Sequence, residues 1–175
     1  MKIKVALSVF IVAIMGTSGL SMAEPNNARF KPGDKNIAEI ATSDPNNFST
    51  LVAALVCTDL VGAVSNPYDE LTVFAPTNAA FAVLNLDASN ICNEFDTATL
   101  TTILLYHVTG ERRPSPSIIN GFDKSVDMLA GGSIYPDGGG SLTIRDNGDN
   151  PVQITTPDVL ASNGIIHVVD HVLLP

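Results

Sequence analysis

Residues 163–175 read NGIIHVVDHVLLP, and this stretch decides the fold that the sequence predicts. Most of its side chains are apolar, and the β-branched ones pack well on a pleated surface but lose rotamer freedom in a helix. Asn163 and Gly164 tolerate the left-handed backbone of a tight turn, so we expect a hairpin that leads into a long C-terminal strand. One face carries Ile165, His167, Val169, His171 and Leu173, and the other carries Ile166, Val168, Asp170, Val172 and Leu174. Both faces are mostly apolar, which predicts an interior strand.

A second apolar stretch, residues 71–84, reads LTVFAPTNAAFAVL. Residues 71–75 are expected to form a buried strand, which Pro76 ends because proline has no N–H to donate to a ladder. Thr77 or Asn78 then caps a short helix, since a short polar side chain can accept a hydrogen bond from a free backbone N–H.

Apolar spacing predicts further helices in the first half of the chain. A short one is expected over residues 36–41, and Asn46 or Asn47 can cap the next. Its core-facing stripe is expected to contain Phe48, Leu51, Val52, Leu55 and Val56. Asp96 can cap another helix, whose buried side is expected to carry Leu100, Ile103, Leu104 and His107. Ser115 and Pro116 suit the N-cap and the first position of a brief helical turn.

From residue 126 onward, Gly and Asx turns separate short apolar stretches. Turns are expected at residues 137–140, 147–148 and 163–164. The segments between them, residues 141–145 and 152–155, are expected to form an antiparallel meander with the C-terminal strand. Helices come first and strands later, which is typical of an α+β fold.

Three motifs in this sequence resemble those of the fasciclin (FAS1) domain family. Residues 71–84 are similar to its first signature box, and residues 163–175 to its second. Between them, LLYHV at residues 104–108 resembles its tyrosine-histidine motif, carried here by Tyr106 and His107. The resemblance covers residues 36–175 and implies an α+β fold, a wedge-shaped antiparallel β-sandwich flanked by several short helices. Thr77, Asn78, Asn163, Gly164, His167 and Asp170 fall in the two boxes and are expected to be structural.

The N-terminal residues predict export. Residues 1–23 combine a positively charged start, a short apolar run and a small-x-small cleavage site, which is typical of a signal peptide. Residues 24–35, rich in Pro, Asn and Gly, are expected to form a loose leader before the domain at residues 36–175. Cleavage removes Lys2 and Lys4 and changes the formal net charge from −9 to −11. This acidic balance argues against nucleic-acid partners, and the apolar run is too short for a comfortable membrane span.

The exported part contains two cysteines, Cys57 and Cys92. In an oxidising compartment we expect them to form a disulfide, while two buried free thiols remain the alternative.

Metal sites receive little support from the residue pattern. His167 and His171 have the spacing of a helical zinc pair, but on a strand they lie about 13 Å apart, at ~3.3 Å per residue. Residues 146–150, DNGDN, carry oxygen ligands that suit calcium but lack the acidic end of an EF-hand loop, so a hairpin turn is expected instead. His167 is expected to be a hydrogen-bonded interior residue and His171 a partly exposed one.

No catalytic motif is recognisable, so we expect a protein that is not an enzyme and needs no cofactor. Tyr106 and His107 have two interpretations: hydrogen-bonded core residues, or the integrin-linked contact that animal family members imply. The resemblance implies adhesion or association at a cell surface or in a matrix, with a protein or polysaccharide partner. The alternative is a soluble carrier of a small apolar ligand, such as a carotenoid or a lipid. Either protein is expected to be secreted or periplasmic.

Overall fold

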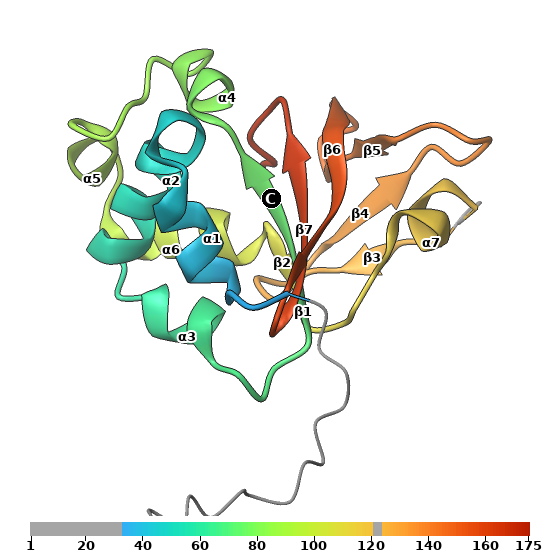
Figure 1. Cartoon of the computed structure of the whole chain (residues 1–175). Coiled ribbons are helices and arrows are strands. Elements are labelled where there is room, and N and C mark those ends of the chain that lie inside the picture. Colours follow the sequence, from blue (N-terminus) through green and yellow to red (C-terminus); the bar gives the residue numbers. More distant parts are fainter. Residues whose placement is uncertain (1–32, 121–123) are drawn as a thin grey trace, which may run out of the picture.

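The computed structural model describes residues 33–120 and 124–175, drawn in colour in Figure 1. The predicted signal peptide and most of the predicted leader lie outside these residues. The helices are α1 (Ile37–Ser43), α2 (Pro45–Cys57), α3 (Val61–Ser65), α4 (Asn78–Ala82), α5 (Ile91–Glu94), α6 (Thr97–Leu105) and α7 (Ser115–Ile119). The strands are β1 (Leu71–Pro76), β2 (Val108–Thr109), β3 (Val126–Asp127), β4 (Ser133–Pro136), β5 (Thr143–Arg145), β6 (Pro151–Ala161) and β7 (Gly164–Val169). This composition confirms the predicted α+β class.

The described strands form one sheet in the order β2-β1-β7-β6-β5-β4-β3. The pairings from β3 through to β7 are antiparallel, as the predicted meander requires. β1 and β7, by contrast, run parallel, with Leu71 opposite Gly164. A parallel pair needs a long crossover connection, and most of the helices and the meander lie between these two strands in the chain. The two fasciclin-like boxes therefore supply neighbouring interior strands of the sheet.

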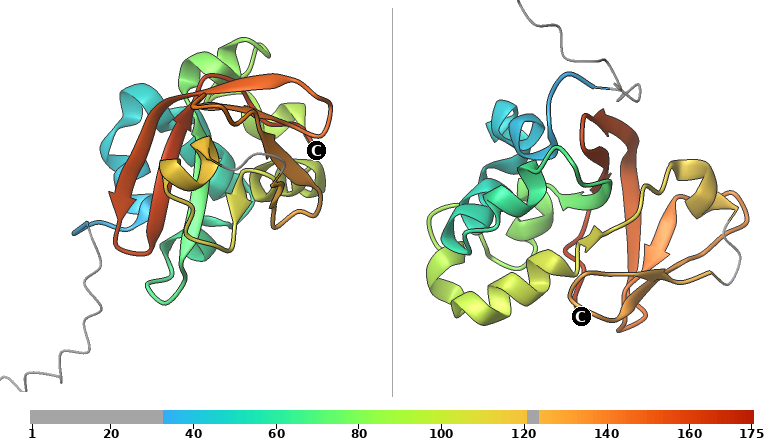
Figure 2. Two further views of the ribbon diagram at one scale, coloured as in Figure 1. Left: turned by 90° about the vertical axis from the view of Figure 1, so that its right-hand side faces the viewer. Right: turned by 90° about the horizontal axis from the view of Figure 1, so that it is seen from below.

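Helices α1 to α6 pack on one face of β1 and β7, and the rest of the sheet curls away from them (Figures 1 and 2). The helix-facing core lies between these helices and strands β1 and β7. The sheet-enclosed core lies within the curl, and its members are Phe74, Tyr106, Ile118, Val126, Met128, Ile134, Ile144, Val152, Ile154, Val169 and Leu173. β7 supplies Ile166 to the first core and Val169 to the second. This confirms that the C-terminal strand is interior on both faces.

Helix α2 shows where the predicted stripe was wrong. Phe48, Leu51 and Leu55 are buried as expected, but Val56 is 63% exposed and Ala54 is completely buried. The helix is surrounded by α1, α4, α5, α6 and β1, so its buried face is wide and turned away from Val56. Neither predicted asparagine caps it, because Asp44 holds the N-cap position and Pro45 begins the helix.

Other boundaries also moved. β7 ends at Val169, before the predicted end of the strand, and β6 extends to Ala161, well beyond residue 155. Helix α7 begins at Ser115, with Pro114 rather than Ser115 at the N-cap. Asp158, at a bulge in β6 with φ +56°, accepts a hydrogen bond from the backbone N–H of Ser115 at 2.8 Å. The start of α7 is thus capped by a residue from another element, which local sequence cannot indicate.

Candidate functional site

The predicted motif residues converge on the two cores. Tyr106 is completely buried at the C-terminal end of α6. Its hydroxyl donates to the carbonyl of Ser133 at 2.7 Å and accepts from the backbone N–H of Asn147 at 3.0 Å. Burial raises the pKa of this phenol, which keeps it neutral and able to donate. Tyr106 therefore ties α6 to β4 and to the turn between β5 and β6.

His107, the next residue, is also buried. Its Nδ1–H donates to the carbonyl of Ile103 at 2.8 Å, and its Nε2 accepts from the backbone N–H of Leu173 at 2.9 Å. Burial lowers the pKa of His107 to about 4, so the imidazole is neutral at physiological pH. One nitrogen thus holds α6 and the other holds the C-terminal tail.

Thr77 and Asn78 join the first box to α2. The hydroxyl of Thr77 accepts from the backbone N–H of Ala80 at 3.2 Å and caps α4, as predicted. Asn78 bonds instead across the fold: its Oδ1 accepts from the N–H of Thr50 at 3.0 Å. Its Nδ2 donates to the carbonyls of Pro45 and Asn46 and to the hydroxyl of Ser49. The side chain thereby fixes the first turns of α2 against the end of β1.

Asn163 is the equivalent joint in the second box. It is completely buried; its Oδ1 accepts from the N–H of Ile37 at 3.0 Å, and its Nδ2 donates to the carbonyls of Val64 and Asn66. Gly164 follows it, and a Cβ there would lie 2.1 Å from the carbonyl oxygen of Leu71. Neither residue has a left-handed backbone, so the predicted reason for the Asn-Gly pair was wrong. The pair is needed for hydrogen bonding and for close approach of β1 and β7.

His167 lies in the centre of β7 beside Phe74, with 5.5 Å between the ring centroids. Its Nε2–H donates to the carbonyl of Arg113 at 2.8 Å, and its Nδ1 accepts from the N–H of Asp158 at 3.2 Å. Burial lowers its pKa. Asp158 also accepts a short hydrogen bond from the hydroxyl of Ser115. Because Ser115 bonds the carboxylate and not the imidazole, these residues do not form a nucleophile with a histidine base.

Asp170 lies just beyond β7 and accepts from the backbone N–H of Gln153 at 2.8 Å, which extends the contact with β6. His171 beside it is exposed and lies 2.9 Å from the same carboxylate. The two side chains form a surface pair, away from His167 in the interior.

The predicted calcium candidate is a turn organised by one buried carboxylate. Oδ1 of Asp146 accepts from the backbone N–H groups of Gly148 and Asn150, at 3.0 and 2.9 Å. The side-chain amide of Asn150 donates to both carboxylate oxygens, and the N–H of Leu174 donates to Oδ2. These oxygens are already satisfied by N–H donors. In residues 33–120 and 124–175 there is no group of three His, Cys, Asp or Glu side chains that could hold a metal ion.

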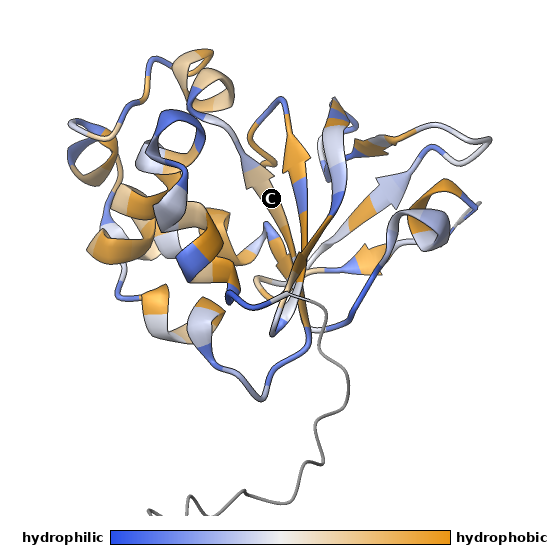
Figure 3. Ribbon diagram, in the orientation of Figure 1, coloured by the Kyte–Doolittle hydropathy of each residue, from blue (hydrophilic) through white to orange (hydrophobic). Residues whose placement is uncertain are grey.

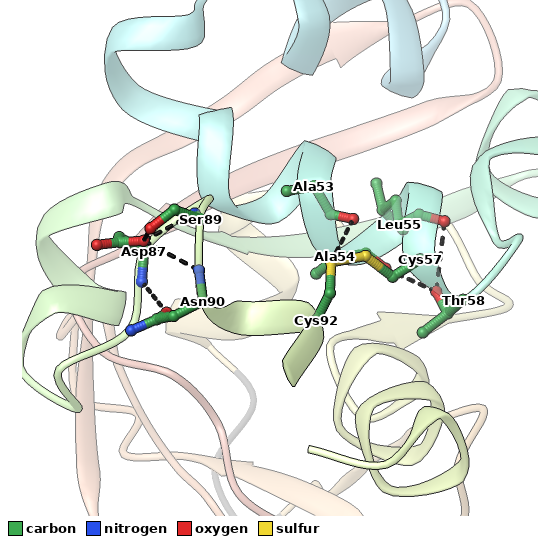
Figure 4. Close-up of a disulfide and its surroundings, with 9 residues drawn as sticks. All are labelled: Ala53, Ala54, Leu55, Cys57, Thr58, Asp87, Ser89, Asn90 and Cys92. Carbon is green, nitrogen blue, oxygen red and sulfur yellow. Dashed lines mark hydrogen bonds between the residues drawn. A yellow bond between two sulfur atoms is a disulfide. The ribbon is translucent and has the colours of Figure 1, made fainter. Parts of the chain in front are cut away.

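Cys57 and Cys92 form the predicted disulfide, with their Cα atoms 6.0 Å apart (Figure 4). The bond joins the C-terminal end of α2 to α5, and the Sγ of Cys92 lies 3.8 Å from the carbonyl of Ala53. A turn before α5 is held by Asp87, whose carboxylate accepts from Ser89 and Asn90. Both cysteines are exposed, so the bond fastens the outside of the helical layer.

With the motif side chains engaged internally, the exposed hollows become the candidate binding surfaces. The first, which we name the helical groove, has a volume of about 140 Å³. It is lined by Leu55, Leu60, Ala63, Val64, Asp69, Leu71, Leu104, Leu105, Val108 and Leu129. The second, which we name the layer groove, has a volume of about 400 Å³ and runs between α1, α2 and strands β6 and β7. Sequence reasoning missed both, because each is assembled from distant segments.

An apolar cavity also lies between α1, α2 and the sheet, with a volume of about 30 Å³. This is room for about one water molecule. Among the described residues, no helix is long and apolar enough to cross a membrane.

Comparison with known proteins places these features in context. A family model described as the fasciclin domain matches residues 46–175. Uncharacterized protein sll1735 of Synechocystis sp. is 35% identical over 139 residues, which cover 79% of this chain and 97% of the relative. Periostin of Homo sapiens is 31% identical over 149 residues, which cover 83% of this chain and 16% of periostin.

A solved structure shares the fold. It is a FAS1 domain pair from the insect cell adhesion molecule Fasciclin I, with a TM-score of 0.67 and 21% identity. The match covers 82% of this chain and 52% of the other, so the chain spans about half the length of the pair.

Proposed function

Since this chain belongs to the fasciclin domain family, we propose that it is a non-catalytic association domain that acts at a cell surface or in an extracellular matrix. Its partner in this proposal is a protein or polysaccharide of that surface or matrix. The support from relatives is that a protein of the same fold is described as a cell adhesion molecule.

One observation carries the proposal: the side chains of the family motifs are used up inside the domain. Tyr106, His107 and Asn163 are buried, and each bonds to backbone groups of other elements. A catalytic site would need reactive groups that face a substrate, whereas these groups face the core. The motifs therefore support the domain as a scaffold, and recognition falls to its exposed surface.

In this proposal Tyr106 and His107 act as positioning residues. Tyr106 holds the turn between β5 and β6, and His107 holds the C-terminal tail through Leu173. Changes at either residue would alter the surface by moving these segments, without any direct contact between the two side chains and a partner.

The proposal also places the domain outside the cytoplasm. Residues 1–23 have the pattern of a signal peptide, and the Cys57–Cys92 disulfide suits an oxidising compartment. Reducing compartments keep exposed cysteine pairs as thiols, so an exposed disulfide favours export.

A carrier of an apolar ligand would need a cavity large enough to enclose that ligand. The apolar cavity of about 30 Å³ is far smaller than the ~300–1,000 Å³ of ordinary ligand pockets. A carotenoid or lipid would therefore have to lie in an open groove, where much of its apolar surface would remain in water.

The test separates the two functions. Surfaces coated with the full chain should retain cells or matrix polymers, and retention should be lost when the coated protein is thermally unfolded. Protein isolated from its own source should yield no stoichiometric pigment or lipid when an organic extract is analysed by mass spectrometry. A loaded protein that retains neither cells nor polymer would overturn the proposal.

A further inference from the structure

The helical groove combines an apolar floor with an apolar rim. Its floor consists of buried side chains from α2, α3, α6, β1 and β2, whereas Leu129 on the rim is 52% exposed. The backbone N–H of Leu129 donates to the carbonyl of Val108 at 2.8 Å, which fixes this residue against β2. Leu60 and Leu105 supply further partly exposed apolar surface. Figure 3 shows apolar residues on both α3 and α6, which flank this part of the molecule.

The charges around the helical groove all have one sign. Asp69 lines it, while Asp59 and Glu70 directly precede the lining residues Leu60 and Leu71. Residues 36–111, which include the whole helical layer from α1 to α6, contain no lysine or arginine. Their nine acidic residues are Glu39, Asp44, Asp59, Asp69, Glu70, Asp87, Glu94, Asp96 and Glu111. A cationic partner is attracted to this surface, whereas an anionic partner is repelled by it.

The cations of the described chain lie elsewhere, and most are already engaged. Arg113 pairs with Glu111, Arg145 pairs with Asp137 and Asp149, and Arg112 donates to the carbonyls of Ala161 and Gly164. Among the described residues, none of these three arginines forms an ion pair with Asp59, Asp69 or Glu70.

Two further features favour a protein partner. Tyr68, next to Asp69, is 90% exposed, and tyrosine is over-represented among the residues that dominate protein interfaces. Helices α2 and α6 both end at the helical groove, and helix C-termini carry partial negative charge. The groove volume of about 140 Å³ is close to that of an engineered 150 Å³ cavity that binds benzene, so it suits one large apolar side chain.

We propose that the helical groove binds a cationic protein segment, which inserts an apolar side chain into the groove and places lysine or arginine beside Asp59, Asp69 and Glu70. This inference rests on the proposed association function and names the chemistry of the partner. Anionic membrane surfaces and acidic polysaccharides are excluded as occupants, because the helical layer would repel them.

Three short synthetic peptides test the proposal by fluorescence anisotropy on the full chain. One alternates lysine with leucine, the second alternates lysine with serine, and the third alternates glutamate with leucine. The lysine-leucine peptide should bind at least tenfold more tightly than either of the others. Its affinity should fall as salt is raised, because exposed charges are screened. Equal affinity for the lysine-leucine and lysine-serine peptides would overturn the role of the apolar groove.

Matched variants locate the site. Leu129→Ser should weaken binding of the lysine-leucine peptide about tenfold, whereas Tyr135→Ser, at a similarly exposed position (49%) on β4, should leave it unchanged. The pair Asp59→Asn and Glu70→Gln should weaken it severalfold. The control pair Asp34→Asn and Glu94→Gln makes the same charge change outside the groove and should have little effect. Equal losses in the groove and control variants would sink the proposal.

The outcomes distinguish this inference from the function on which it rests. If coated protein retains cells or polymer and Leu129→Ser retains them equally well, the association function stands and the helical groove is not its site. If no retention is seen at all, the association function itself fails. If a second copy of the chain binds the helical groove, light scattering should show a mass that rises with protein concentration. If Leu129→Ser abolishes that rise and the unmodified chain does not bind the lysine-leucine peptide, the occupant is a second copy and not a cationic segment.

Discussion

Two hairpin turns of this chain carry the dipeptide Asn-Gly, and the structure places them in opposite environments. Asn163, in the turn between β6 and β7, and Gly164, the first residue of β7, are buried against α1, α3 and β1. Asn147 and Gly148, between β5 and β6, are exposed. The side chain of Asn163 makes three hydrogen bonds to other elements. From the exposed turn, by contrast, the backbone N–H of Asn147 donates to the hydroxyl of Tyr106.

The difference shows that the same local signal can mark a surface turn or a joint of the whole domain. The dipeptide indicates where the chain reverses, and both reversals were predicted. What lies against the turn decides its importance, and this comes from segments distant in sequence: Ile37 lies 126 residues before Asn163. The two turns can therefore be compared directly by identical substitutions.

The largest expected effect is that of Gly164→Ala. The new Cβ would lie 2.1 Å from the carbonyl oxygen of Leu71. That oxygen is a backbone atom of β1, which pairs in parallel with β7, so no side chain can move aside to make room. Overpacking of this kind is relieved only by moving the strands, so we expect a loss of about 4 kcal/mol in the free energy of unfolding. Chemical denaturation measures it.

Gly148→Ala is the matched control. The nearest atom to its Cβ is the side-chain amide nitrogen of Asn150, at 2.8 Å, which can move on a flexible side chain. Its cost should stay below about 1 kcal/mol. Similar losses in the two variants would contradict the assignment of Gly164 as a close-approach residue.

Asn163→Ala is expected to cost about 3 kcal/mol. It leaves the N–H of Ile37 and the carbonyls of Val64 and Asn66 without this partner, in a buried setting where each unsatisfied group is costly. Thermal and denaturant unfolding measure the loss. Asn147→Ala should change stability by less than about 0.5 kcal/mol, because the contact of Asn147 with Tyr106 uses backbone only. A ranking in which the exposed asparagine matters more would reverse the comparison.

The C-terminal tail should make the domain sensitive to acid. It follows β7, its Leu173 N–H donates to His107, and its Leu174 N–H donates to Asp146 in the exposed turn. The unfolded chain binds a proton at His107 below pH 6.5, whereas burial holds the folded pKa at about 4. Between these two pKa values the unfolded state binds more protons, so the free energy of unfolding falls as pH falls. The stabilising contribution of neutral His107 is fully present above pH 6.5.

At pH 5 the expected loss from His107 is about 2 kcal/mol, at 1.36 kcal/mol for each pH unit below 6.5. His167, whose pKa is also lowered, acts in the same direction. Unfolding free energies measured between pH 7 and pH 4 should fall less steeply in His107→Gln than in the unmodified chain. His171→Gln, which replaces an exposed histidine, is the matched control. Identical slopes in all three proteins would remove His107 as the source.

Local signals in the sequence accounted for the parts of the fold that are local in the structure. Asp96 and Thr77 cap their helices as predicted, because a cap depends on residues within one turn. The interior strand β7 and the Cys57–Cys92 pair were also expected. The FAS1 resemblance supplied the fold, which the FAS1 domain pair shares, but the predicted antiparallel sandwich did not include the parallel pairing of β1 and β7 within one mixed sheet.

The remaining features depend on contacts between distant segments. Val56 was placed in the core, but the neighbours of α2 turn it outward. The cap that Asp158 provides for α7 crosses 43 residues, and the helical groove needs α2, α3, α6 and Leu129 together. Periodicity reports which side of an element is apolar, but not what that side meets or what remains uncovered.

Apart from the control variants, the smallest expected effect concerns the exposed turn itself, through Asp146→Asn. This change keeps one oxygen, which can still accept from the N–H groups of Gly148 and Asn150, and loses the second acceptor oxygen. We expect a loss of about 1 kcal/mol in the free energy of unfolding, because one oxygen gives way to an amide group to which Asn150 and Leu174 cannot donate.

The calcium hypothesis can be tested at the same carboxylate. Its oxygens face N–H donors, so millimolar CaCl₂ should leave the melting temperature of the unmodified chain unchanged. A calcium-dependent rise that disappears in Asp146→Asn would show that the turn rearranges to bind the ion, and would make the exposed Asn-Gly turn, not the buried one, the adaptable site of the domain.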